Sequence, residues 1–354
     1  MNHPALHSPP IPERVAAIHV AVAQAGTQAE FGTLIEPYRR ELQVYCYRML
    51  GSPLDAEDMV QETLLRAWRR RNTFIQAISF RAWLYKIATN ICLNTLVKRP
   101  RRVLMISAHP VEDPRELMAA PIEEPIWLEP FPDEWLTDSA ENPEARYSSH
   151  ESITLAFMAA LQWLPPRQRA VLILREVLDW HADETAELLG LTVSAVNSAL
   201  HRARMTLGRH YPEPTHETTQ PNSAAIDQLL ERYVRAWETA DIAGLVSLLR
   251  EDATLTMPPI PSWYRGSTAI GNLLEAGVFI HGQPGWEWRL VPTRANGQTA
   301  LAMYRRADAD EAFLAFTLQI LTIDPASGHI AGLINYLNPA LLPCFGLPIA
   351  LPAD

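Results

Sequence analysis

LPPRQRAVLILREVLDWHADETAELLGLTVSAVNSALHRARMTL, residues 164–207, is the stretch that decides the fold of the middle of this chain. Pro165 and Pro166 open a predicted helix in which apolar residues recur at helical spacing. A second helix is predicted over 183–189. It stops at Gly190, because glycine suits the left-handed position that follows many helices.

The third predicted helix begins after Thr192, a good capping residue, and runs to about Arg209. One stripe of this helix is polar and consists of Ser194, Asn197, Ser198, His201 and Arg202. The opposite side is apolar, and no acidic residue interrupts the helix. A helix, a glycine turn and a second helix form a helix-turn-helix, whose second helix enters the major groove of DNA. A solvated amphipathic helix would share the stripe, but the whole pattern favours DNA binding.

The same stretch resembles region 4 of the extracytoplasmic-function (ECF) branch of sigma-70 factors. The resemblance is carried by Trp180, Glu184, Ala186, Leu189, Gly190, Thr192, Val196, Ser198, Arg202 and Ala203. It implies that the module binds the −35 promoter element through the polar stripe. His181 departs from the family pattern, in which serine usually caps the second helix. We expect Asp179 or Asp183 to compensate, or the helix start to be weaker.

A second motif lies upstream, where residues 55–68 read DAEDMVQETLLRAW. Asp55 is expected to cap a long helix whose exposed face is acidic and amidic. The motif resembles sigma region 2.2, which in the family docks on the β′ clamp helices of core RNA polymerase. By that resemblance Asp58, Gln61 and Glu62 become the polymerase contacts, and the β flap is the further polymerase partner implied.

A basic stretch follows, because residues 63–102 contain no Asp or Glu. Cations with interleaved aromatic residues suit single-stranded nucleic acid. The stretch resembles sigma regions 2.3 and 2.4, which open the −10 element, with residues 72–79 as the specificity loop. The −10 contacts implied are Arg71, Asn72, Phe74, Phe80, Arg81, Lys86 and Asn90. Trp83, Leu84, Ile87 and Ile91 are expected in the core, and for Trp68 and Phe80 both roles stay open.

The formal net charge of −10 does not exclude DNA binding, because the charge is segregated. Acidic residues and prolines concentrate in 103–151, a composition that predicts an extended or disordered linker. In sigma factors the corresponding linker threads through the polymerase active-site cleft and RNA exit channel. Within it residues 127–133, WLEPFPD, are unusually apolar. We interpret them as a docking motif for polymerase or for the C-terminal domain, with a local turn as the alternative.

A different kind of domain follows the polar linker 212–222. Two amphipathic helices lead into a strand, and further strands are predicted at 286–292, 299–305, 313–323 and 330–337. Helices followed by a meander of strands predict an α+β fold. The order, with EDATLTMPP, SWYRG and the closing strand, resembles the SnoaL-like branch of the nuclear-transport-factor-2 superfamily, which are cone-shaped α+β barrels.

Enzymes of that superfamily need a carboxylate inside the cone to take a proton. Met257 stands where the general-base aspartate would be, and a thioether cannot accept a proton. Asp252 lies at the start of the strand and is expected in a cap or turn. Tyr233, Trp237, Met257 and Trp263 are the candidate pocket residues. An aromatic interior is usually packed core, but binding of a small apolar ligand stays open.

Targeting and redox features point to the cytoplasm. Residues 1–26 lack a basic start followed by an apolar core, so no signal peptide is predicted. Residues 334–354 are nearly uncharged, but their four prolines exclude a spanning helix, so the tail is expected to pack across a domain interface. Three cysteines without paired spacing fit a reducing compartment and no structural metal. No cofactor and no membrane contact are expected.

The expected organisation is multidomain, with two all-α sigma domains followed by the α+β cone. Its parts are a disordered N-terminal extension (1–26), region 2 (27–102), the acidic linker (103–151), region 4 (152–211), a second linker (212–222), the SnoaL-like domain (223–343) and an apolar tail (344–354). The favoured function is an ECF sigma factor whose activity is modulated by the C-terminal domain, with no enzymatic activity. Two alternatives are a helix-turn-helix regulator that never contacts polymerase, and an enzyme that the DNA modules target.

Overall fold

The structure, a computed structural model, describes residues 26–74, 79–104, 113, 120–121, 127–136, 154–210, 223–279, 285–308 and 311–353. The chain divides into two compact units. The helical unit comprises residues 1–50, 55–99 and 164–205, and the sheet unit comprises 51–54, 100–163 and 206–354. The expected extension 1–26 lies outside the described residues except for its last position.

Three long helices form the first part of the helical unit: α2 (Gln28–Leu50), α3 (Pro53–Arg69) and α4 (Phe80–Lys98). Helix α3 begins at Pro53, two positions before the expected cap, because proline is favoured in a first helical turn. Asp55 therefore lies within the helix, where its carboxylate pairs with Arg99 at 2.6 Å. Ser79 caps α4 by accepting a hydrogen bond from the Ala82 N–H at 3.1 Å.

The decisive stretch folds as predicted into α7 (Pro166–Leu172), a π-helical turn η5 (Ile173–Val177), α8 (Ala182–Leu189) and α9 (Val193–His210). Gly190 ends α8 in the left-handed conformation, with φ of 63°. The Thr192 hydroxyl caps α9 by accepting from the Ala195 N–H at 3.1 Å. The start of α8 is stabilised by Glu184 and not by the expected Asp179 or Asp183. The Glu184 carboxylate accepts the His181 N–H at 2.9 Å.

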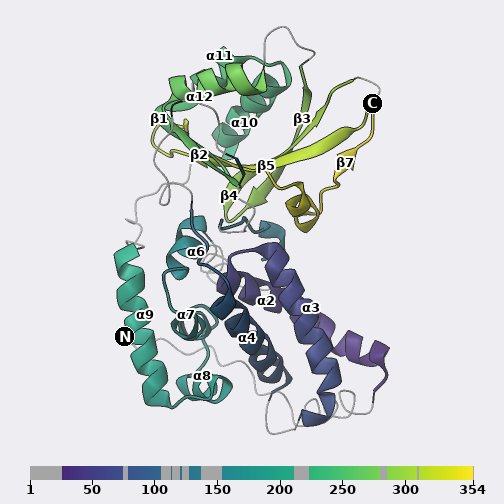
Figure 1. Cartoon of the computed structure of the whole chain (residues 1–354), viewed down its shortest axis with the longest axis vertical. Coiled ribbons are helices and arrows are strands. Elements are labelled where there is room, and N and C mark those ends of the chain that lie inside the picture. The colour runs from purple at the N-terminus through teal and green to yellow at the C-terminus, as the bar shows by residue number, and fades with distance from the viewer. Residues whose placement is uncertain are drawn as a thin grey trace. The chain divides into compact units, whose positions relative to one another are not determined.

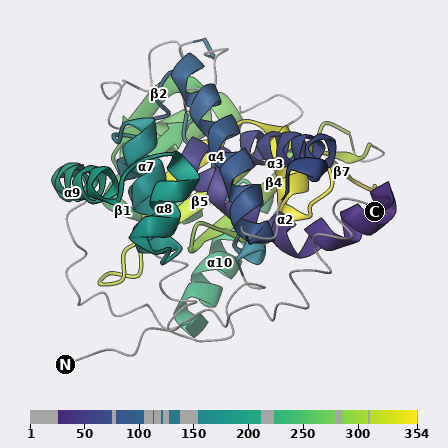
Figure 2. The same cartoon turned by 90° about the horizontal axis from the view of Figure 1, so that it is seen from below.

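Within the helical unit, α4 lies beside α7 and α8 (Figure 1, Figure 2). The rings of Tyr85 and Trp180 pack with centroids 5.1 Å apart. The buried guanidinium of Arg169 donates to the backbone carbonyl of Met49, and burial lowers the pKa of Arg169 to about 10. The two candidate DNA modules therefore share one core in this structure.

The sheet unit carries the α+β fold expected from the sequence. Its elements after residue 206 are α10 (Ser223–Glu238), α11 (Ile242–Ser247), β1 (Leu249–Met257), β2 (Ile260–Arg265), α12 (Ser267–Leu273), η6 (Leu274–Val278), β3 (Glu287–Ala295), β4 (Gln298–Arg306), β5 (Phe313–Ile323), β6 (Ile330–Tyr336), η7 (Pro339–Phe345) and β7 (Ala350–Leu351). The strand order is β2-β1-β6-β5-β4-β3, with β1 and β6 parallel and the other pairs antiparallel. The unit also holds α6 (Leu155–Leu161) and the turn η3 (Asp133–Trp135).

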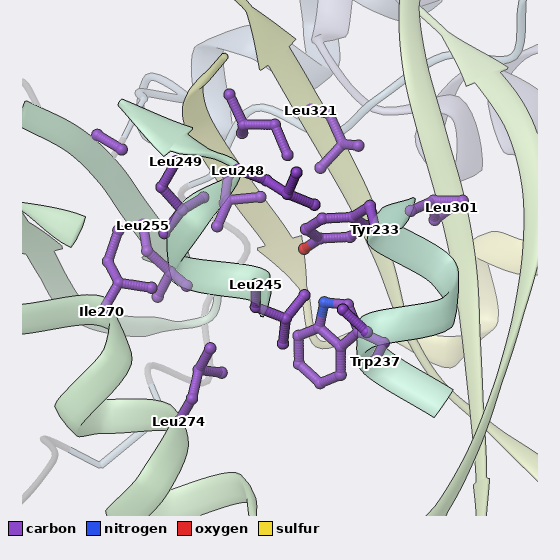
Figure 3. Close-up of a cluster of buried hydrophobic side chains, with 14 of the residues drawn as sticks. Tyr233, Trp237, Leu245, Leu248, Leu249, Leu255, Ile270, Leu274, Leu301 and Leu321 are labelled. Carbon is purple, nitrogen blue, oxygen red and sulfur yellow. The ribbon is translucent and has the colours of Figure 1, made fainter. Parts of the chain in front are cut away.

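Helices α10, α11 and α12 cover one face of this sheet and enclose its hydrophobic core (Figure 1). Figure 3 shows Tyr233 and Trp237 of α10 pointing into that cluster. Leu255, Met257 and Leu333 belong to the same cluster. Because strand residues alternate between faces, their neighbours Thr256 and Ile334 lie on the opposite face of the sheet.

The C-terminal tail completes the sheet of its own domain. Strand β7 pairs with the start of β5, where Phe313 faces Leu351. The Tyr304 hydroxyl donates to the Pro348 carbonyl at 2.8 Å. These contacts lie within the sheet unit, and the packing across a domain interface expected for this tail stays a prediction. No helix in the described part of the chain is long and apolar enough to cross a membrane.

Candidate nucleic-acid interface

The exposed face of α9 brings the predicted −35 residues together. Ser194, Asn197, Ser198, His201 and Arg202 are all exposed and line one open hollow with Val193. Val196, Ala199, Leu200 and Ala203 are buried beneath it. Val193 was not predicted, although its spacing of four from Asn197 is the signal that places it on this face.

Arg202 and Arg204 of α9 differ in whether they form an ion pair. Arg204 forms an ion pair with Glu176. Among the described residues Arg202 makes no ion pair, and its side chain is exposed. Arg202 is therefore the arginine within the hollow that is available to a guanine edge or a phosphate.

Two aromatic residues predicted to contact the −10 element lie in the core instead. Phe74 and Phe80 are 2% and 1% exposed, and their rings pack edge to face with centroids 5.2 Å apart. Trp83 packs against both rings and is buried, as expected. In this structure the two phenylalanines support the surface from beneath, which differs from the predicted base contact.

Two of the predicted −10 cations are engaged within the protein. The Arg71 guanidinium lies 4.0 Å from the ring centroid of Trp68. Arg81 pairs with the Glu41 carboxylate at 3.0 Å, and burial raises the pKa of Glu41 against the opposing effect of Arg81. Arg81 also lies over the Trp180 ring. Its role in this structure is to join helices, which the sequence did not reveal.

The remaining −10 residues lie at the surface. Lys86 and Asn90 are exposed one turn apart on α4, and Asn72 is exposed in the short turn η1 (Arg71–Thr73). Asn94 continues the stripe, followed by Val97, which is 82% exposed. These two were missed, although helical spacing from Lys86 marks them. Residues 75–78 of the predicted specificity loop lie outside the described residues.

The polymerase-binding candidates occupy one stripe of α3. Asp58 and Gln61 are exposed, and Glu62 pairs with Arg66 at 2.6 Å. Leu65 lies at helical spacing from both Asp58 and Gln61 and is 50% exposed. A half-exposed leucine beside acidic and amide groups extends the candidate contact surface, and the sequence analysis missed it.

The apolar linker motif 127–133 is held at its first half by residues near the start of α3 and the end of α4. The Trp127 carbonyl accepts from Arg102 at 2.6 Å, and the Glu129 N–H donates to the Gly51 carbonyl at 2.9 Å. The Ser52 hydroxyl donates to the Glu129 carboxylate at 2.5 Å. Gly51 has φ of 75°, and a Cβ atom there would lie 2.7 Å from the Leu128 side chain. Glycine is therefore required at position 51, where the backbone passes close to Leu128.

The second half of the motif binds the β3–β4 hairpin. The Phe131 N–H donates to the Asn296 side-chain oxygen at 2.7 Å, and the Asn296 N–H donates back to the Phe131 carbonyl at 3.0 Å. The Asp133 carboxylate accepts from the Gly297 N–H at 2.8 Å and from Arg294 at 3.3 Å. The second half of the motif thus contacts the C-terminal domain, one of the two docking partners considered for it.

The four candidate pocket residues do not form one site. Tyr233, Trp237 and Met257 lie in the packed cluster between the sheet and its helices. Trp263 lies in a second cluster with Trp127 of the linker motif. The Tyr233 hydroxyl donates to the Gln319 side-chain oxygen at 2.7 Å, so this buried polar group is satisfied within the protein.

Comparison with protein families and known proteins agrees with this geometry. The model of sigma-70 region 2 matches residues 34–102, that of sigma-70 region 4 matches 154–207, and that of the SnoaL-like domain matches 230–329. The ECF RNA polymerase sigma factor SigG of Mycobacterium tuberculosis is 44% identical over 326 residues, which cover 92% of this chain and 85% of SigG. The chain belongs to the ECF sigma factor family.

A second relative shares the whole domain order of this ECF sigma factor. SigJ of M. tuberculosis is 29% identical over 311 residues, covering 86% of this chain and 90% of SigJ. The crystal structure of M. tuberculosis SigJ aligns with a TM-score of 0.52 at 23% identity, covering 90% of this chain and 99% of that chain. That likeness establishes a common fold of helical sigma domains followed by a SnoaL-like domain.

Family membership decides between the functions considered from the sequence. The protein is a sigma factor that binds core RNA polymerase and promoter DNA in transcription initiation. It is a transcription factor and not an enzyme, although SnoaL-like folds include enzymes elsewhere. Met257 is buried in the core and Asp252 lies outside it, exposed and paired with Arg250.

Proposed function

We propose that the SnoaL-like domain restrains this sigma factor by holding the linker motif 127–133 on the β3–β4 hairpin. The observation that carries the proposal is the pair of reciprocal hydrogen bonds between Phe131 and Asn296, next to the buried Asp133 carboxylate. This contact connects the segment between regions 2 and 4 directly with the C-terminal domain.

Burial of Asp133 gives the contact its strength. Its side chain is 9% exposed, and it accepts from one backbone N–H and one guanidinium. Hydrogen bonds to a charged group contribute about 1.5–3 kcal/mol each, and leaving a buried carboxylate unpaired costs more. The linker therefore leaves the hairpin only when other contacts compensate.

The resemblance to sigma factors supplies the reason that release matters. In the family this linker threads through the polymerase active-site cleft and RNA exit channel. A motif held by Gly51 and Arg102 at one end and by Asn296 and Gly297 at the other cannot follow that path. We infer that core polymerase and the hairpin compete for the same seven residues.

The packing inside the helical unit supports the same restrained state. Arg169 of region 4 donates to Met49 of region 2, and the Tyr85 ring packs at a tilt against Trp180. The −10 and −35 elements lie on separate stretches of a duplex that rises about 3.4 Å per base pair. Region 2 and region 4 must separate to reach both elements, so this packing has to open on the promoter.

The roles of individual residues follow from their exposure. We assign −35 contacts to the α9 hollow, Ser194, Asn197, Ser198, His201 and Arg202, with Val193 added. Polymerase contacts are assigned to the α3 stripe of Asp58, Gln61 and Glu62, with Leu65 added. We assign the −10 contacts to the exposed residues Lys86, Asn90 and Asn72.

Run-off transcription with bacterial core polymerase tests the restraint. Wild type and Asp133→Asn are compared on fragmented genomic DNA with mapping of transcript 5′ ends. The Asp133→Asn variant should give more of the same discrete starts, because its linker is released more readily. Asp308→Asn, an exposed acidic residue of the same domain, serves as the control. Equal output from Asp133→Asn and wild type would refute the restraint while leaving the sigma factor identity intact.

A further inference from the structure

A cavity lies on the face of the sheet that α10, α11 and α12 do not cover. Its volume is about 520 Å³, within the range of sites for drug-sized molecules. Thr256, Pro258, Ile334 and Tyr336 form its floor on the sheet. The other walls come from α6 and Trp163, from His210, and from the linker, where Trp127 and Leu128 begin the motif 127–133 and Val103 and Leu104 precede it.

The walls of the cavity are largely apolar. No lining residue is Asp, Glu, Lys or Arg, and the ionisable side chains among the lining residues are His210 and Tyr336. Aromatic rings contribute to the lining, namely those of Trp127, Trp163 and Tyr336 together with the His210 imidazole. A charged ligand would lose hydration there with no carboxylate, ammonium or guanidinium among the lining residues to compensate, so the chemistry favours a neutral molecule.

One wall is held in place by stacking. The His210 ring lies parallel to the Trp163 ring with centroids 4.2 Å apart, and the Arg101 guanidinium lies 3.5 Å from the centroid of the same indole. Trp163 is thus fixed although its side chain is 44% exposed. A preformed aromatic wall favours binding, because little side-chain freedom remains to be lost.

We propose that this cavity binds an uncharged, flat, largely apolar small molecule. The site differs from the cone interior, where Tyr233, Trp237 and Met257 already fill the space as packed core. It lies on the opposite face of the sheet, at Thr256 and Ile334, and is completed by the linker.

The linker contribution makes the cavity a regulatory site. Trp127 and Leu128 belong to the motif that the hairpin holds, and the same residues form the wall that a ligand would touch. A ligand that binds only the docked linker stabilises the docked state. This consequence for transcription rests on the proposed restraint, whereas binding itself does not.

Titration of the full-length protein with N-phenyl-1-naphthylamine, an uncharged fluorescent aromatic probe, tests the site. Wild type should show one saturable site. Ala159→Phe on α6 and Ile334→Trp on the sheet floor each fill the cavity and should weaken binding at least tenfold. Ala243→Phe places the same ring on an exposed position of α11 and should bind as wild type does.

Three results would overturn the inference: no saturable binding, binding that survives both filling substitutions, or equal loss in Ala243→Phe. Thermal unfolding identifies a variant that does not fold, and hydrogen exchange on the unmodified protein needs no variant. The probe should slow exchange of the Leu128 and Glu129 amides, and unchanged exchange with probe bound would also contradict the site. If the probe binds as expected but leaves transcription unchanged, the cavity stands and its coupling to the proposed restraint fails.

Discussion

The Asp133 carboxylate accepts a hydrogen bond from the backbone N–H of Gly297 at 2.8 Å, across 164 positions of sequence. The donor is presented by a turn in which Asn296 and Gly297 have φ of 52° and 76°. Asn-Gly is the residue pair that a tight hairpin of this hand prefers. The Asn296-Gly297 turn of the hairpin therefore binds one carboxylate of the linker.

Replacing that carboxylate should loosen the linker without unfolding the domain. Asp133→Asn removes the charge that faces Gly297 and Arg294, and a charged hydrogen bond contributes about 1.5–3 kcal/mol. Hydrogen exchange of the Phe131 and Asn296 amides should accelerate about tenfold or more. In the control Asp308→Asn these amides should keep their wild-type rates. Retained protection in Asp133→Asn would mean that the carboxylate does not hold the motif.

The two buried phenylalanines of region 2 should behave as core residues. Phe80→Ala should lower the free energy of unfolding by about 3–5 kcal/mol, because Phe80 is 1% exposed. Denaturant unfolding measures this cost. The exposed Lys86→Ala should leave stability unchanged and reduce opening of the −10 element. Unaltered stability of Phe80→Ala with defective opening would restore the base-contact role predicted from the sequence.

The α3 stripe should contribute to polymerase affinity through its apolar member as well. Leu65→Ser should weaken core binding by about 1–2 kcal/mol, roughly five- to thirtyfold, because a partner that covers this half-exposed leucine gains the burial of its apolar surface. Asp58→Ala should weaken core binding with little effect on the binding of region 4 to DNA. Affinity for core polymerase is measured directly. Leu314→Ser changes a leucine that is 60% exposed in β5 and should bind as wild type does.

Promoter recognition should depend on the exposed arginine of the hollow. Arg202→Ala should cost about 1–3 kcal/mol in −35-dependent initiation, the usual value of one base contact. Arg232→Ala, an exposed arginine on α10, is the matched control. Transcript yield on templates with intact and scrambled −35 elements reports the effect. A uniform loss on both templates would assign Arg202 to phosphates instead of bases.

Local sequence patterns predicted most helices and strands well, because the formation of these elements depends on residues that are neighbours in the sequence. Gly190 ends α8 and Thr192 caps α9 as expected, and the predicted strand 313–323 coincides with β5. Strand β7 was missed because two residues carry no alternation. Its position depends on Phe313, 38 residues earlier in the chain.

Site residues were harder to predict, because exposure depends on distant partners. Arg81 resembles a DNA-binding cation in sequence, yet Glu41, 40 positions earlier, pairs with it. Phe80 resembles a base platform until the packing of Phe74 and Trp83 is known. The α9 stripe was predictable because one helix places all five of its residues on one face.

The central claim is that the linker motif must leave the hairpin for initiation. A reversible cross-link between the two tests this claim most directly. Pro132 and Ala295 are antiparallel bridge partners, so the double variant Pro132→Cys/Ala295→Cys places two thiols at a separation that a disulfide can span. The native cysteines are buried and do not compete for the new pair. Oxidised protein should give few transcripts with core polymerase, and reduction of the same sample should restore them. Equal transcription before and after reduction would contradict the restraint.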